Sequence, residues 1–197
     1  MYKKFLKRVL DVLIALWLLV IFSPIIAVIS IILLFYNKGM VLFKQKRPGK
    51  HEKPFVLLKF QTLRPMSEAF ISHHQRVTKF GNFLRKTSLD ELPQLINVLK
   101  GEMSLIGPRP LLMEYLPLYN DFQKKRHSVL PGITGLAQVK GRNALSWEEK
   151  FKFDVHYVEN LHWKLDFKIG IMSFLAIFSQ RGIYDTNGQI VENFKGN

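Results

Sequence analysis

The feature that most constrains this chain is an apolar run of 25 residues near its N-terminus, at positions 12–36. Only Ser23, Pro24 and Ser30 interrupt the run, and as a helix it is long enough to cross a bilayer core of roughly 30 Å. The run is too long for the apolar core of a signal peptide, and no small-residue cleavage site of the A-x-A kind ends it. We therefore expect a segment that stays attached to a membrane.

Whether this run crosses the membrane depends on Pro24 and on the flanking charges. Pro24 removes one helical hydrogen bond and pushes away the carbonyl of Val20, while Ser23 can hydrogen-bond back to the backbone. A bend of this kind is compatible with a kinked span. Positive charge on both sides favours instead a re-entrant helix-break-helix that returns to the cytoplasmic face. The cations are Lys3, Lys4, Lys7 and Arg8 before the run, and Lys38, Lys44, Lys46 and Arg47 after it. In lipid, the backbone groups freed at the break must be satisfied by Ser23 or by neighbours.

The net charge of +14 is concentrated in the first part of the chain. Residues 1–86 contain 16 Lys and Arg against three acids, whereas residues 87–197 contain 13 against 12. This distribution indicates a polyanion beneath the first half, either nucleic acid or the anionic cytoplasmic leaflet. Nucleic acid is the poorer candidate, because the basic residues flank a lipid-soluble run and no recognition motif is present. The chain has no cysteine, which excludes a disulfide framework and a thiolate metal site.

The residues after the apolar run predict short strands and one loop. Apolar residues 40–43 and 54–60 predict two strands around a basic turn at 44–49, and 103–106 predicts a third, buried strand. Residues 61–78 have no clear period and are expected to form a mobile loop. At 197 residues, the chain can hold one domain of ordinary size besides the membrane segment.

Two adjacent carboxylates, Asp90 and Glu91, lie at the start of a predicted helix. Ser88 followed by Glu91 is a capping-box pattern, and Gly101 predicts the helix end. Pro93 bears on which residue begins the helix. If Asp90 is the N-cap, Pro93 falls among the first helical positions, whose N–H groups have no helical partner, and it costs no hydrogen bond. If Ser88 is the N-cap, Pro93 falls just past those positions, so the start of the helix stays open. Acidic residues in a first turn are also ordinary compensation of the helix dipole.

The neighbouring cations favour a functional interpretation of the carboxylate pair. Arg85 and Lys86 precede it, and Arg109 lies between two prolines that restrict its backbone. Cations beside a carboxylate pair are what a phosphate-handling site requires, because carboxylate and phosphate otherwise repel one another. Lys59, at the end of the second predicted strand, either faces the same phosphate or solvates a strand edge.

The last third of the chain contains a basic cluster, a glycine-containing segment and two predicted helices. The cluster at 124–127 is typical of a solvated helix end, with a lipid headgroup or a phosphate as the alternative. Three glycines in 131–143 permit close backbone approach to a ligand, which is weak evidence by itself. Ser146 with Glu149 is a second capping-box pattern. Asp166 can cap an apolar helix over 167–180, which belongs to the core or to the membrane interface. The polar residues that follow predict a loosely held tail.

Taken together, these motifs resemble the small monotopic bacterial phosphoglycosyl transferases, the polyprenyl-phosphate sugar-1-phosphate transferase family. The resemblance covers essentially the whole chain. Its length and C-terminal half look most like the member that initiates bacterial N-linked glycans from a UDP-activated diacetylated bacillosamine. Gln61 departs from the family pattern, which usually has Lys or Arg there, and Lys140 stands where the family usually has Asn. The motifs that carry the resemblance are the basic N-terminus with its Ser23-Pro24 break, Lys59-Phe60, residues 85–94, 107–110, 131–135 and 141–143, and Asp166.

The resemblance implies a reaction in two steps. Asp90 would attack the β-phosphate of a UDP-sugar, release UMP and hold the sugar phosphate as an acyl phosphate, which undecaprenyl phosphate would then accept. The sugar would be an N-acetylated or diacetylated amino sugar. The family uses Mg²⁺, for which Glu91 is the expected ligand or positioning carboxylate and Asp166 a further candidate ligand. The side chains expected to bind substrate phosphate are Lys59, Arg85, Arg109 and Arg142, and guanidinium groups suit bidentate phosphate contacts.

The expected architecture is an α+β fold at the cytoplasmic face of a bacterial inner membrane. We predict a re-entrant membrane hairpin over 1–37, a small mixed α/β catalytic domain with short strands and interfacial amphipathic helices over 38–182, and a polar tail over 183–197. The expected partners are a UDP-sugar, undecaprenyl phosphate and a phospholipid membrane, without nucleic acid.

Two other functions are compatible with the sequence. A non-catalytic protein that binds anionic lipid through its basic half would lose affinity steeply with salt and would not depend on Asp90. A UDP-sugar hydrolase, or a transferase with a different acceptor, would release UMP without consuming polyprenyl phosphate.

Overall fold

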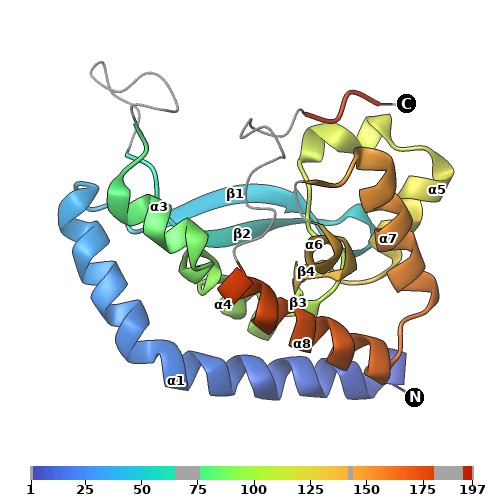
Figure 1. Cartoon of the computed structure of the whole chain (residues 1–197), viewed down its shortest axis with the longest axis horizontal. Coiled ribbons are helices and arrows are strands. Elements are labelled where there is room, and N and C mark those ends of the chain that lie inside the picture. The colour runs from blue at the N-terminus through green and yellow to red at the C-terminus, as the bar shows by residue number, and fades with distance from the viewer. Residues whose placement is uncertain (1, 65–75, 142–143, 180–192, 197) are drawn as a thin grey trace.

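The computed structural model describes residues 2–64, 76–141, 144–179 and 193–196 (Figure 1). It confirms the α+β class: a long N-terminal helix runs along one side of a small domain that contains two two-stranded sheets and several short helices. The helices and strands are α1 Lys7–Tyr36, β1 Leu42–Pro48, β2 Pro54–Phe60, α3 Lys79–Lys86, α4 Gln94–Lys100, β3 Ser104–Ile106, α5 Asp121–Lys124, β4 Gly132–Thr134, α6 Leu136–Lys140, α7 Trp147–Glu159 and α8 Trp163–Ser179.

Helix α1 bends sharply partway along its length (Figure 1). Pro24 lies inside the helix and cannot donate to the carbonyl of Val20, and the hydroxyl of Ser23 donates to that oxygen at 2.8 Å. The predicted hydrogen bond from Ser23 to the backbone is confirmed, but α1 is one continuous bent helix and not two helices separated by a break, because the hydroxyl of Ser23 occupies the carbonyl that Pro24 leaves without a donor. In the described part of the chain, α1 is the one helix that is long and apolar enough to cross a membrane.

Both halves of α1 pack against the domain. Ala15, in the first half, is fully buried against α4 and β2. Ile29 and Leu33, in the second half, are buried against Phe60 and Leu84. Burial of one aliphatic side chain contributes about 1.5–3 kcal/mol. The bend therefore lets one helix contact two separate parts of the domain core.

Strands β1 and β2 form an antiparallel hairpin that extends from the Leu42–Phe60 pair to the Pro48–Pro54 pair. The basic residues 44–47 lie within β1, so the prediction that they form the turn is wrong; the chain turns at residues 49–53. The physical reason is that β1 is largely exposed, so its cations remain solvated while its backbone pairs with β2. Strands β3 and β4 pair in parallel.

The segment that follows β2 leads into α3. Residues 65–75 of the predicted loop lie outside the described residues, and Leu63 and Val77 on either side form an isolated antiparallel bridge. Thr78 caps α3 by accepting a hydrogen bond from the N–H of Gly81 at 2.8 Å. A Cβ on Gly81 would lie 1.9 Å from the carbonyl oxygen of Thr62, so glycine is required for this close approach.

The C-terminal helices confirm one predicted cap and correct another. Ser146 and Glu149 form the expected capping box at the start of α7. Helix α8, however, begins at Trp163 and contains Asp166 in its first turn, so Asp166 does not cap it. The ring Nδ1 of His162 instead accepts from the N–H of Leu165 at 3.0 Å.

The end of the chain also packs more tightly than predicted. Phe194 is buried in an aromatic cluster with residues of α7 and of the 3₁₀ turn Met113–Leu118. Its ring centroid lies 5.1 Å from that of Phe151. Aromatic burial is strongly favourable, so this part of the predicted loose tail is held on the domain.

Candidate functional site

Lys59 and Arg109 meet at one oxygen of Glu91. The Nζ of Lys59, at the end of β2, lies 2.6 Å from Oε1 of Glu91, and Nη2 of Arg109 lies 3.0 Å from the same atom. The three residues are 18 to 50 positions apart in the sequence and come from separate segments. The structure thus brings together three of the predicted site residues.

Asp90 lies beside this cluster and is less constrained by it. Its side chain is mostly buried, and Nζ of Lys59 is 4.0 Å from Oδ2. Among the described residues no hydrogen-bond donor is recorded for either carboxylate oxygen of Asp90. Burial and the neighbouring negative charge of Glu91 raise the pKa of Asp90 to about 6, although Lys59, Arg109 and Arg85 act in the opposite direction.

Glu91 has the opposite electrostatic character. Burial alone would raise its pKa, but Lys59 and Arg109 outweigh that effect and lower the pKa to about 2. The two carboxylates titrate as a pair, with Glu91 ionised at every physiological pH and Asp90 ionising close to neutrality. Two neighbouring carboxylates with separated pKa values are typical of groups with different chemical roles.

The backbone around the pair differs from both predicted helix starts. Residues Leu89–Glu91 form a 3₁₀ turn, and α4 begins only at Gln94, after Pro93. Ser88 has a positive φ of 58° and makes no side-chain cap, so the predicted capping box is wrong. The carboxylate of Glu91 is engaged by Lys59 and Arg109 instead. Asp90 is not the N-cap of α4 either, because that position is occupied by Pro93. Gly101 ends α4 in the left-handed conformation, as predicted.

Asn97 fixes α4 against β2. Its amide nitrogen donates to the carbonyl of Val56 at 2.8 Å and its amide oxygen accepts from the N–H of Leu58 at 3.1 Å. The fully buried side chain therefore pairs with the edge of β2 as a neighbouring strand would. Because Lys59 follows Leu58, this clamp sets the position of the lysine relative to the carboxylates. No local sequence pattern distinguishes Asn97, because its partners lie about 40 positions away.

Arg8 connects α1 to the opposite end of α4. Its Nη1 donates to the carbonyl of Val98 at 2.6 Å and its Nη2 to that of Leu99 at 3.0 Å. Carbonyls in a last helical turn lack helical partners and attract cations. Arg8 was predicted only as a charge flanking the apolar run, and the structure shows that it binds the helix that follows the carboxylate pair.

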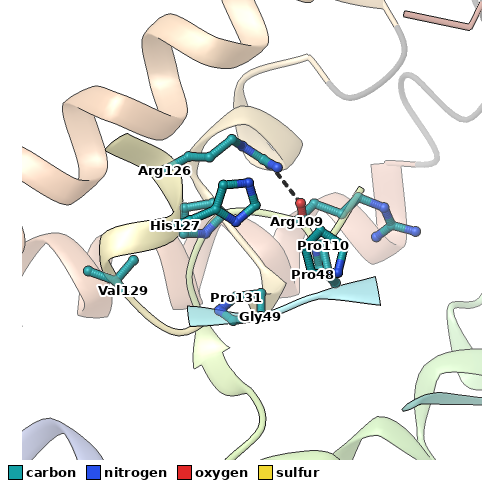
Figure 2. A pocket seen from close by; sticks show the side chains of 9 residues that line it. Pro48, Gly49, Arg109, Pro110, Arg126, His127, Val129 and Pro131 are labelled. Atoms are coloured by element: carbon teal, nitrogen blue, oxygen red, sulfur yellow. Dashed lines mark hydrogen bonds between the residues drawn. The ribbon is translucent and has the colours of Figure 1, made fainter. Parts of the chain in front are cut away.

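A buried ion pair holds the main chain of Arg109. Arg126 donates from Nε and Nη2 to Oδ2 of Asp154, at 3.0 and 2.7 Å, and Nη2 also donates to the carbonyl of Arg109 at 2.7 Å. Figure 2 shows Arg126 reaching this carbonyl while the guanidinium of Arg109 points away from it. Arg126 and Asp154 are both almost completely buried. The ion pair therefore orients a residue that contacts Glu91.

The basic cluster at 124–127 is consequently divided between surface and interior. Lys124 and Lys125 are exposed, whereas Arg126 and His127 are buried, so the prediction of a solvated helix end is wrong for the last two. Burial, with the adjacent charge of Arg126, lowers the pKa of His127 to about 4 and keeps its ring neutral at pH 7. Arg126 and His127 line a small cavity of about 10 Å³ beside the Arg109 loop, with room for roughly one water (Figure 2).

Glycines fix the position of the Arg109 loop in a different way. A Cβ on Gly132 would lie 2.1 Å from the backbone nitrogen of Gly107, and one on Gly135 would lie 2.2 Å from the Gly107 carbonyl oxygen. Side chains cannot fit at these distances. The predicted close approach is therefore made by one backbone segment to another, next to the Pro108-Arg109-Pro110 turn.

The remaining predicted site residues are Arg85, Arg142 and Asp166, and the structure places the first and the last of them in different surroundings. The Nε of Arg85 donates to Oγ1 of Thr62 at 2.8 Å, and its charge acts on Asp90. Arg142 lies outside the described residues. Asp166 belongs to a different cluster: its Oδ2 accepts from the hydroxyl of Tyr2 and from Nζ of Lys7, and its Oδ1 accepts from the hydroxyl of Tyr157.

The carboxylate pair fits magnesium only together with a substrate. Among the described residues, no three His, Cys, Asp or Glu side chains gather as a metal cage. Magnesium is commonly held by one or two carboxylates with substrate phosphates completing its shell. Asp90 and Glu91 can supply such a pair. Asp166 does not fit as a ligand, because hydroxyl and ammonium donors use both of its oxygens.

Comparison with known proteins gives one family and several curated relatives. A family model described as bacterial sugar transferase matches residues 2–180. The uncharacterized sugar transferase EpsL of Bacillus subtilis is 48% identical over 97% of this chain and 96% of its own length. The exopolysaccharide production protein ExoY of Sinorhizobium fredii is 36% identical, over 90% of this chain and 88% of its own. The UDP-glucose:undecaprenyl-phosphate glucose-1-phosphate transferase of Escherichia coli is 38% identical over 89% of this chain, which spans 40% of that relative.

Proposed function

Because the chain belongs to the bacterial sugar transferase family, we propose that it transfers a sugar 1-phosphate from a UDP-sugar to undecaprenyl phosphate, through a covalent intermediate on Asp90. The enzyme class, an undecaprenyl-phosphate sugar phosphotransferase, follows from the family and from the named relatives. Relatives named for exopolysaccharide production support polysaccharide assembly as the process. The covalent step is implied by the family resemblance, and the contacts of the two carboxylates in this chain support it.

The observation that carries the covalent step is the contrast between the two carboxylates. Glu91 is held by Lys59 at 2.6 Å and by Arg109 at 3.0 Å, which makes it a fixed anion. Asp90 accepts no hydrogen bond within the described residues and lies 4.0 Å from Nζ of Lys59, so its carboxylate can still engage a substrate phosphate. A carboxylate nucleophile divides a difficult transfer into two easier steps.

The two steps are balanced in atoms and charge. A carboxylate oxygen of Asp90 attacks the β-phosphorus, the bond from that phosphorus to the bridging oxygen breaks, and UMP leaves. A phosphate oxygen of undecaprenyl phosphate then attacks the same phosphorus, the acyl phosphate bond breaks, and the free carboxylate of Asp90 returns. The products are UMP and a polyprenyl-diphosphate sugar.

The cations around the pair stabilise the phosphate that enters the site. Lys59 and Arg109 contact Glu91, and the positive charge of Arg85 lowers the pKa of Asp90. These cations would stabilise the negative charge that develops on the phosphoryl group during transfer. Magnesium held by Asp90 or Glu91 together with the diphosphate would offset further charge on the donor. Arg142 remains a proposed phosphate ligand on the resemblance alone.

The donor sugar is proposed from the family resemblance and from the names of relatives. The family resemblance favours an N-acetylated or diacetylated amino sugar. Relatives in E. coli and Salmonella typhimurium are named for glucose and galactose phosphate transfer. A donor panel must therefore contain UDP-glucose, UDP-galactose and the UDP-N-acetylated amino sugars.

The function is tested by incubating the purified chain with radiolabelled UDP-sugars, Mg²⁺ and undecaprenyl phosphate. We expect label in the organic phase for at least one donor, with release of one UMP for each sugar phosphate transferred. UMP release that does not require the acceptor would identify a hydrolase. The absence of product across the whole panel would contradict the assignment.

We further propose that α1 enters the membrane and returns to the same side. Arg8, at its start, binds α4, and Asn37, just after its end, donates to the carbonyl of Gln61 at 2.6 Å. Both ends of α1 are thus attached to the one domain that carries the carboxylates. Exposed apolar residues between them, including Trp17 and Val20, would face lipid.

The topology predicts that cysteines at Lys3 and Lys50 are labelled from the same side of sealed vesicles. The chain has no native cysteine, so each variant carries a single reactive thiol. A cysteine at Val20, which is 66% exposed in the middle of the apolar run, is the matched control and should resist a membrane-impermeant reagent. Labelling of positions 3 and 50 from opposite sides would exclude the hairpin.

Arg126→Lys tests whether the buried ion pair positions Arg109. Lysine keeps the charge but loses the forked contact to Asp154 and the Arg109 carbonyl, so we expect kcat/KM to fall about tenfold, the value of one charge-assisted hydrogen bond. The charge of Arg109 lowers the pKa of Asp90, so displacing Arg109 should raise that pKa. The acidic limb of the pH profile of activity should therefore move to higher pH. Lys125→Arg, on the exposed neighbour, is the control. A lower melting temperature with an unchanged pH profile would show that Arg126 stabilises the fold without positioning Arg109.

A further inference from the structure

A second cavity, separate from the carboxylate pair, lies between α6, α7 and α8. Its volume is about 500 Å³, within the range of pockets that hold small ligands. The floor is apolar and includes Ile169 and Met172 of α8. Four basic side chains surround it, and none of the lining residues is acidic; the basic residues are Lys140, Lys152, His156 and Lys168.

The charges around this cavity are only partly neutralised. Nζ of Lys152 lies 2.7 Å from Oε1 of Glu148, but both side chains are more than 60% exposed, and such a pair is worth little in water. Within residues 2–64, 76–141, 144–179 and 193–196, no salt bridge is recorded for Lys140 or Lys168. An anion placed among these ammonium groups gains attraction without displacing a strong internal partner.

The apolar floor indicates what else the occupant must contain. A small hydrophilic anion would pair with the lysines but leave apolar surface in contact with water. Covering such surface is worth roughly 25 cal/mol per Å². The chemistry of floor and rim together therefore matches a phosphate that bears a hydrocarbon chain.

The position of α8 indicates where that molecule comes from. Trp163, Phe167 and Ile171 form an exposed apolar stripe along α8, with Phe167 67% exposed, and Leu165, Lys168 and Met172 line the cavity from another face of the same helix. The contacts of Asp166 with Lys7 and Tyr2 place the start of α8 beside the start of α1. Exposed tryptophan and phenylalanine beside basic residues are typical of a helix at a lipid headgroup layer.

We propose that the cavity between α6, α7 and α8 binds one anionic phospholipid, with its phosphate among Lys140, Lys152 and Lys168 and the start of its acyl chains on the apolar floor. This site goes beyond sugar-phosphate transfer and rests only on the proposed attachment of the chain to a membrane. Its role is to hold the domain at a fixed orientation on an anionic surface. Polyprenyl phosphate shares the chemistry but is assigned to the reaction at Asp90.

The test is native mass spectrometry of the full chain in detergent, titrated with phosphatidylglycerol. We expect one retained lipid per chain, and an affinity about 30-fold lower in the Lys140→Gln, Lys168→Gln double variant, because each surface lysine contributes about fivefold for an anionic lipid. Lys124→Gln, Lys125→Gln removes the same charge from exposed positions outside the cavity and should bind like the unchanged chain. Both variants retain α1, so lipid bound to that helix cancels in the comparison.

Further titrations test which ligand the cavity prefers and whether its apolar floor contributes to binding. Phosphatidylcholine and inorganic phosphate should each bind at least tenfold more weakly than phosphatidylglycerol, and Met172→Glu, which places a carboxylate on the floor, should weaken phosphatidylglycerol. Equal affinity for phosphatidylcholine, or equal loss in the two double variants, would overturn the site. Preferential displacement by undecaprenyl phosphate would overturn the choice of phospholipid. Because the readout is lipid retained, a failed donor panel leaves this test unaffected.

Discussion

Asp90→Asn is expected to reduce sugar-phosphate transfer by at least about 1,000-fold, the usual consequence of removing a nucleophile. Asparagine has nearly the same shape as aspartate but lacks the anionic oxygen that would attack phosphorus. Transfer is measured as labelled lipid product from the donor identified in the panel. The loss should appear in kcat, because the amide leaves the cations at Lys59, Arg85 and Arg109 available to bind the donor.

The same variant provides a test that does not depend on the acceptor. Incubating the unchanged chain with donor alone should add the mass of one phosphosugar to the peptide that contains residues 89–95, and Asp90→Asn should add none. Asp121→Asn is the matched control, because Asp121 is fully exposed and lies outside the site. Phosphosugar on any other peptide, or full activity in Asp90→Asn, would contradict the nucleophile assignment.

Glu91→Gln is expected to lower kcat about 100-fold, the typical cost of removing one fixed electrostatic group from a phosphoryl-transfer site. Glutamine cannot hold the ammonium of Lys59 and the guanidinium of Arg109 with the same strength, and it offers magnesium a poorer ligand. Glu159→Gln, at an exposed position paired with Lys125, is the control and should retain full activity.

Glu91→Gln should also change the pH dependence in a defined direction. In the unchanged enzyme Asp90 must be ionised to attack, so activity should rise with pH through its pKa of about 6. The negative charge of Glu91 is one cause of that raised pKa, and Lys59, Arg109 and Arg85 oppose it. Removing the charge lowers the pKa of Asp90, so the acidic limb of the residual activity should move to lower pH. A limb that stays in place would indicate that another group controls ionisation.

Hydrogen bonds connect α1 to the segment that carries the candidate site. Arg8 of α1 binds the carbonyls of Val98 and Leu99 at the end of α4, and Asn97 joins the same helix to the strand that ends in Lys59. Helix α1 is therefore joined through α4 to the strand that carries Lys59. With the proposed lipid acceptor and soluble donor, a site fixed to α1 would be held at the depth where both can reach it.

Features encoded by local sequence were predictable. The apolar helix, the Ser23 hydrogen bond beside Pro24 and the Ser146 capping box each depend on residues close together in the sequence, and the structure contains all three. The grouping of carboxylates with Lys59 and Arg109 was predicted from their types and from the family resemblance. Ser88 shows where local reasoning failed, because the side chain of Glu91 binds distant cations in place of the capping position.

By itself, the sequence determined that this chain has a long apolar helix bearing a proline, a small α+β domain and a pair of acids among cations, because helix periodicity, caps and turns arise from interactions between near neighbours. Only the tertiary structure decided that Arg8 and Asn97 fix α4, that Arg126 is buried and orients Arg109, and that Asp166 binds Lys7. These contacts join residues 17 to 159 positions apart, and their free energy depends on burial and on partners that no local pattern contains.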